Sequence, residues 1–72
     1  MSKITEHIGG RIRSIRRARG LTLQQLADMI HKSRASVSKY ETGEAVPDLE
    51  TVVRMADFFG VSLDEFVVRE GK

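Results

Sequence analysis

Several features are missing or scarce in this 72-residue sequence, and each absence narrows the class of protein. There is no cysteine, which excludes disulfide bonds and thiolate metal sites and is compatible with a reducing cytoplasm. No apolar run approaches the roughly 18 residues that a membrane helix needs. The N-terminal residues also lack the apolar centre of a signal peptide. We therefore expect a cytoplasmic protein with no membrane partner.

The short chain limits the chemistry that it can support. Its 72 residues predict one domain over 1–72, with a core over about 8–67 and frayed ends. A domain of this size forms no deep cleft, so we expect a protein that is not an enzyme and takes no cofactor or small-molecule ligand. His7 and His31 are far apart and have no metal-ligand spacing, so no metal site is expected. A binding module or small oligomer is the simplest interpretation.

Charge is distributed unevenly along the chain, although the net charge is only +2. Residues 1–43 hold nine Lys or Arg against three Asp or Glu, whereas residues 44–72 hold three against seven. A basic half indicates a polyanion such as nucleic acid or an anionic membrane. An ordinary soluble surface explains the same charges equally well. Four arginines of the first helix are expected to form a solvated face, with some reaching a phosphate at long range: Arg11, Arg13, Arg17 and Arg19.

With one proline and almost no alternating pattern, the apolar residues follow helical spacing, which predicts an all-α fold. A first helix is expected over residues 8–19, and a second after a capping box at Thr22 and Gln25. The third is expected from Ser33 to Thr42, the fourth after Asp48 and the fifth after residue 62. In the fourth helix, the residues expected to face inward are Leu49, Val52, Val53, Ala56 and Phe59.

The second and third helices are joined by a tight connection, and the third has a narrow apolar seam and a broad polar face. This arrangement suggests a helix-turn-helix, whose second helix fits the DNA major groove and reads base edges with polar side chains. Arg34, Ser36, Ser38 and Lys39 supply donors and acceptors, and Ala35 suits a thymine methyl.

Motifs along most of the chain resemble the Cro/CI-type (lambda-repressor-like, XRE) helix-turn-helix family. The resemblance covers roughly residues 8–67 and implies a five-helix DNA-binding domain whose third helix enters the major groove. The runs that carry it are Gly20-Leu21-Thr22, Gln25-Leu26-Ala27, Val37-Ser38-Lys39-Tyr40-Glu41-Thr42-Gly43 and Phe59-Gly60-Val61-Ser62-Leu63-Asp64-Glu65-Phe66.

The resemblance also implies roles for single residues. An ion pair is expected between Arg16 and Glu41. Base contacts would fall on Arg34, Ala35, Ser38 and Lys39. Backbone contacts would fall on Thr22, Gln24, Ser33, Ser36, Tyr40 and Thr42. Gln24 is included because Leu23 stands where the family often has the phosphate-binding glutamine, and His31 stands where the family often has glycine.

The last two turns carry more apolar surface than so small a core can hide, which predicts a homodimer interface at Phe66, Val67 and Val68. The sequence thus predicts a transcriptional regulator that binds a palindromic operator in double-stranded DNA, similar to phage-type repressors or restriction-modification controllers. It would block RNA polymerase or contact it. The alternative is a protein-interaction module or antitoxin-like adaptor that uses its acidic half, with DNA binding secondary.

Overall fold

The computed structural model describes residues 3–67, and for residues 3–7, 65 and 67 it describes the backbone alone. Its helices are α1 (Lys3–Ala18), α2 (Leu23–Met29), α3 (Arg34–Thr42), α4 (Leu49–Phe59) and α5 (Leu63–Val67). No strand occurs among these residues, so the prediction of an all-α fold is confirmed. In the same range, no helix is long and apolar enough to cross a membrane.

Helix α1 begins five residues before the predicted start, at Lys3 rather than Ile8. The prediction relied on the apolar stripe that Ile8, Ile12 and Ile15 form, and it treated the preceding residues as a frayed end. Ile4 extends the same four-residue spacing by one turn, and the pair Gly9-Gly10 does not interrupt the helix. Residues 1–2 and 68–72, where frayed ends were also predicted, lie outside the described residues.

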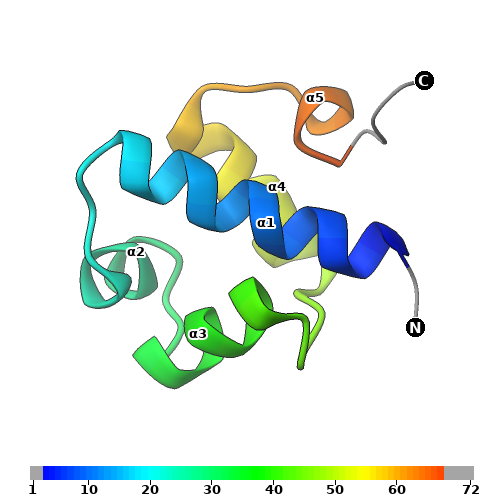
Figure 1. The fold of residues 1–72 in the computed structure, drawn as a ribbon. Coiled ribbons are helices and arrows are strands. Elements are labelled where there is room, and N and C mark those ends of the chain that lie inside the picture. The colour runs from blue at the N-terminus through cyan, green and yellow to red at the C-terminus, as the bar shows by residue number, and fades with distance from the viewer. Residues whose placement is uncertain (1–2, 68–72) are drawn as a thin grey trace.

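Helix α1 lies across the middle of the molecule, between α5 on one side and the pair α2 and α3 on the other, with α4 behind it (Figure 1). Each helix contributes apolar side chains to one core, in which the Phe59 and Phe66 rings lie 6.0 Å apart. The buried residues are Ile8, Ile12, Leu26, Ala27, Ile30, Val37, Tyr40, Val52, Met55, Phe59 and Phe66.

The buried face of α4 differs from the predicted one. Leu49 is 72% exposed and Val53 is 37% exposed, whereas Met55, which the prediction omitted, is fully buried. The observed face runs through Val52, Met55, Ala56 and Phe59, which follow the three- and four-residue spacing of a helix. Leu49 and Val53 lie on a neighbouring stripe that no other described element covers.

The predicted position of Phe66 in a homodimer interface is corrected by the structure. Its side chain has no exposed surface and packs against Phe59 within the monomer. The sequence pattern could not distinguish an apolar residue that faces a partner from one that closes its own core. Val67 is described by its backbone alone, and Val68 lies outside the described residues.

Candidate DNA-binding interface

The capping box predicted at the start of α2 is present. The Gln25 N–H donates to the Thr22 hydroxyl oxygen (3.0 Å), and the Thr22 N–H donates to Oε1 of Gln25 (2.8 Å). Two backbone donors that a helix start leaves unpaired are thereby satisfied. Thr22 itself stays exposed at the positive end of the helix dipole, where an anion is favoured.

The turn between α2 and α3 depends on a left-handed residue. His31 has φ 59°, the one positive φ at a non-glycine residue in the described range. A side chain is uncommon in this region of backbone space, so glycine would be easier here. The turn is closed by the Lys32 N–H, which donates to the carbonyl of Ala27 (2.9 Å).

Helix α3 starts at the Ser33 cap and presents a polar face outward. The Ser36 N–H donates to Oγ of Ser33 (3.0 Å), which fixes the first turn. The opposite side is held in the fold by Val37, Tyr40 and Glu41. Of the four residues predicted to contact bases, Ala35, Ser38 and Lys39 lie away from this seam, and Arg34 lies at its edge, close to Glu41 around the helix axis. Arg34, Ala35 and Lys39 are exposed and Ser38 is half-buried.

The residues predicted to contact the DNA backbone are not equally accessible. Tyr40 belongs to the core and is 8% exposed, so only a small part of it can meet a phosphate. The Gln24 amide donates to Asp28 (2.9 Å), and the Thr42 hydroxyl lies 3.2 Å from a Glu44 oxygen. Thr22, Gln24, Ser33 and Thr42 are exposed, and Ser36 is half-buried.

The structure brings Arg16 and Glu41 together. Nε and Nη2 of Arg16 donate to the Glu41 carboxylate (2.6 and 3.1 Å), and Nη1 donates to the carbonyl of Leu21 (2.9 Å). These bonds fix α3 and the α1–α2 connection to α1. The hydrogen bonds to Glu41 raise the pKa of Arg16 above its already high usual value, although burial opposes the shift.

A second arginine also reaches Glu41, which the sequence interpretation missed. Nε of Arg13 lies 3.4 Å from Oε1 of Glu41. The spacing of Arg13 and Arg16, three residues apart on one side of α1, was the signal available in the sequence.

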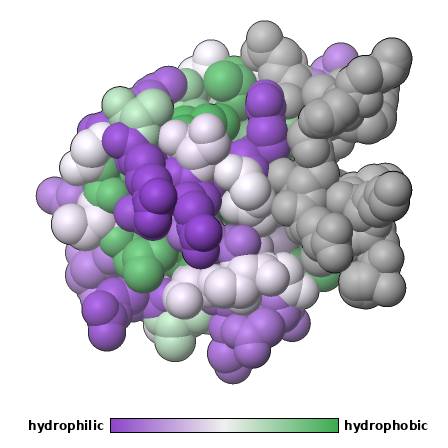
Figure 2. Space-filling model, viewed as in Figure 1, coloured by the Kyte–Doolittle hydropathy of each residue, from purple (hydrophilic) through white to green (hydrophobic). Residues whose placement is uncertain are grey.

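In Figure 2, which has the view of Figure 1, hydrophilic residues cover most of the coloured surface and hydrophobic residues appear in patches between them.

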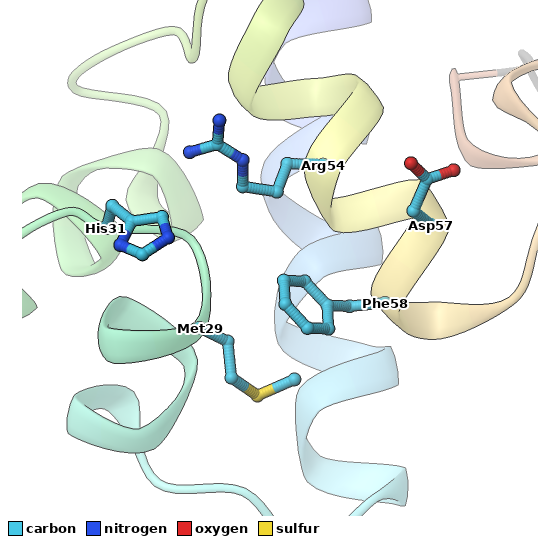
Figure 3. Close-up of a pocket in the computed structure, with 5 residues that line it drawn as sticks. All are labelled: Met29, His31, Arg54, Asp57 and Phe58. Carbon is cyan, nitrogen blue, oxygen red and sulfur yellow. The ribbon is translucent and has the colours of Figure 1, made fainter.

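A shallow groove of about 410 Å³ lies between the α2–α3 turn and α4. Figure 3 shows Met29 and His31 on the turn side, with Arg54 and Phe58 extending toward them from α4 and Asp57 of α4 directed away. The walls thus combine apolar and charged groups. Within the described residues, no three His, Asp or Glu side chains are grouped to hold a metal ion.

The arrangement of α2, turn and α3 agrees with comparisons of the sequence. A family model described as helix-turn-helix matches residues 12–66. The chain belongs to the Cro/CI-type helix-turn-helix family. Its members are transcriptional regulators that bind double-stranded DNA, rather than enzymes.

Two curated helix-turn-helix relatives and one solved structure show the extent of the similarity. The cryptic phage CTXphi transcriptional repressor RstR of Vibrio cholerae is 41% identical over 59 residues, which cover 82% of this chain and 53% of RstR. The SPbeta prophage-derived regulator YonR of Bacillus subtilis is 38% identical over 56 residues, 78% of this chain and 52% of YonR. The restriction-modification controller protein C.AhdI from Aeromonas hydrophila superposes with a TM-score of 0.79 at 26% identity, over 86% of this chain and 94% of C.AhdI. The chain spans about half the length of the two curated relatives.

Proposed function

We propose that this chain is a five-helix domain that binds a palindromic operator as a homodimer and thereby represses or otherwise controls transcription in the cytoplasm. The observation that carries the proposal is the polar outward face of α3, which is held in place by its buried seam. RstR is named a phage repressor and C.AhdI a restriction-modification controller, and both names support a regulator of this kind.

The proposed complex assigns base contacts to the outward face of α3. Arg34 or Lys39 suits the O6 and N7 acceptors of guanine, and Ala35 suits a thymine methyl. Ser38 lies between them on the same face. Phosphate contacts are assigned to the capped starts of α2 and α3, with Thr22, Gln24, Ser33 and Ser36, and to the last turn of α3, with Thr42 and the exposed part of Tyr40.

The proposed homodimer needs apolar surface near α5. Leu63, at the start of α5, is 40% exposed, whereas Phe66 is buried. The proposed interface therefore consists of Leu63, Val67 and Val68, without Phe66. Two α3 helices would then lie about 34 Å apart, one turn of DNA, if the dimer reads adjacent major grooves. Occupation of the operator would block RNA polymerase or bring it into contact.

The experiment that tests this proposal is selection of bound sequences from a random duplex pool at about 150 mM salt, with the purified chain. A recovered palindrome would support specific dimeric binding and would identify the operator. A folded chain that recovers nothing above background would contradict the proposal.

The second candidate is a protein-interaction module or antitoxin-like adaptor. The uncovered apolar residues of α4, Leu49 and Val53, lie beside Glu50 and Asp57 in the acidic half of the chain. An exposed apolar surface of this kind can mark a protein interface. Failure of the selection experiment by a folded chain would favour this candidate.

A further inference from the structure

The two arginines that contact Glu41 differ in exposure and in the number of hydrogen bonds that they donate. The Glu41 carboxylate is 3% exposed and Arg16 is 12% exposed, and Arg16 directs Nε, Nη1 and Nη2 at protein oxygens. Arg13 is 47% exposed and makes one longer contact through Nε, 3.4 Å from Glu41. One carboxylate cannot neutralise two guanidinium groups, so the cluster keeps a positive charge at the surface, on Arg13.

The remaining donors of Arg13 are available to another acceptor. A guanidinium group carries five N–H donors, four of them on its two terminal nitrogens. Among the described residues, those terminal nitrogens have no recorded hydrogen bond. The Nε contact restrains the side chain, so less conformational entropy is lost when an anion binds.

Glu41 places this charge at one edge of the outward face of α3. At 100° per residue, Glu41 lies only about 20° around the helix from Arg34 and about 60° from Ser38. A helix in the major groove, which is about 12 Å wide, has a phosphate strand along each flank. Arg13 therefore lies on the flank of α3 that faces α1.

The loop after α3 supplies no cation of its own. Residues 43–47 contain no Lys or Arg, and they include the exposed carboxylate of Glu44, which is close to the Thr42 hydroxyl. A phosphate strand near the end of α3 would meet this negative charge. The exposed cation from another element that contacts the end of α3 is Arg13 of α1, through Glu41.

We propose that Arg13 is a DNA-backbone-binding residue, held by Glu41 so that its terminal nitrogens meet a phosphate on the α1 side of α3. The inference rests on the proposed DNA binding. It extends that proposal by making the Glu41 cluster both a fold-stabilising pair and a phosphate-binding group, with Arg16 in the first role and Arg13 in the second.

The test measures the dissociation constant at several salt concentrations for the wild type, Arg13→Ala and Arg17→Ala, on the selected operator and on a random duplex of equal length. Arg17 is the matched control, because it is exposed on α1 one turn away and has no recorded side-chain partner in the described range. One phosphate contact adds about 0.9 to the slope of log K against log salt, so Arg13→Ala should lower the slope by that amount and weaken binding about eightfold at 0.1 M salt. The loss should be equal on both duplexes, and the thermal midpoint should change little.

A duplex with one methylphosphonate at each backbone position in turn gives a second measurement. The neutral position that weakens the wild type but has no further effect on Arg13→Ala would identify the phosphate. The inference is overturned if Arg13→Ala keeps the wild-type salt slope, or if Arg17→Ala loses as much as Arg13→Ala. Absence of salt-dependent binding by the folded wild type would instead contradict the proposed function itself.

Discussion

Glu41 combines a deeply buried charge with two basic partners from another helix. Replacement by alanine would leave the mostly buried Arg16 without its carboxylate, and breaking a buried pair costs about 3–5 kcal/mol. We expect Glu41→Ala to lower the free energy of unfolding by about 3 kcal/mol, measured by urea denaturation. Glu50→Ala is the control, because the Glu50 side chain is 77% exposed and its pair with Arg54 contributes about 0.5 kcal/mol or less. Equal effects of the two variants would show that the pair of Arg16 and Glu41 does not stabilise the fold.

The outward residues of α3 should affect sequence discrimination. We expect Arg34→Ala or Lys39→Ala to weaken binding to the selected operator by about 1–3 kcal/mol and binding to random duplex much less. The reason is that a base contact is lost only where the correct base is present. Fluorescence anisotropy on both duplexes measures the difference. Equal losses on the two would show that these residues contact phosphate only.

Asp48, the N-cap of α4, should make the stability of the fold depend on pH at acidic pH. The Thr51 hydroxyl and N–H hold the pKa of Asp48 below its ordinary value of 3.8. Since the folded state lowers this pKa, the stabilisation is present above the unfolded value and is lost as the pH falls through the folded one. Asp48→Asn keeps a capping oxygen but cannot titrate. We expect its thermal midpoint to fall less than that of the wild type between about pH 4 and pH 2. Parallel pH curves for the two proteins would contradict this.

At the scale of the element, the approach of α1 to α3 depends on Gly9. A Cβ at Gly9 would clash with the carbonyl oxygen of Tyr40 and lie 2.8 Å from that of Glu41, whereas a Cβ at Gly10 would meet nothing within 4 Å. We expect Gly9→Ala to destabilise the fold by about 1–3 kcal/mol, because backbone must move. Gly10→Ala should stabilise α1 by about 0.5–1 kcal/mol through helix propensity. Thermal unfolding of both variants measures this, and a stabilising Gly9→Ala would show that the helices are farther apart.

The elements that carry their own end signals were predicted well from the sequence. Thr22, Ser33 and Asp48 cap the starts of α2, α3 and α4, because their side chains bond to backbone groups three residues away. Residues without such local signals were less predictable. No capping motif was identified in the sequence at the start of α1. Leu49 and Val53 have apolar side chains, and only the packing of the helices shows that they lie outside the core.

For the whole molecule, dimerisation should appear as a dependence of stability on protein concentration. If folding is linked to association, the thermal midpoint rises with concentration by mass action. We expect a rise over a hundredfold range for the wild type. Leu63→Asp, a change at an exposed position of α5, should remove this rise and leave the helical circular dichroism unchanged. Sedimentation equilibrium that gives the monomer mass at every concentration would contradict the homodimer.

The sequence by itself determined the all-α fold, the caps of the central helices and the polar residues of α3, because capping and helical spacing act over three or four residues. It also indicated the pair of Arg16 and Glu41 through the family resemblance. Only the tertiary structure decided that Phe66 is buried in the core, that α3 approaches α1 closely at Gly9, and that Arg13 shares Glu41 with Arg16. The contacts between Phe59 and Phe66, between Gly9 and Tyr40, and between Arg13 and Glu41 join residues that are 7, 31 and 28 positions apart. Such contacts depend on how whole helices pack, which local patterns of residues do not specify.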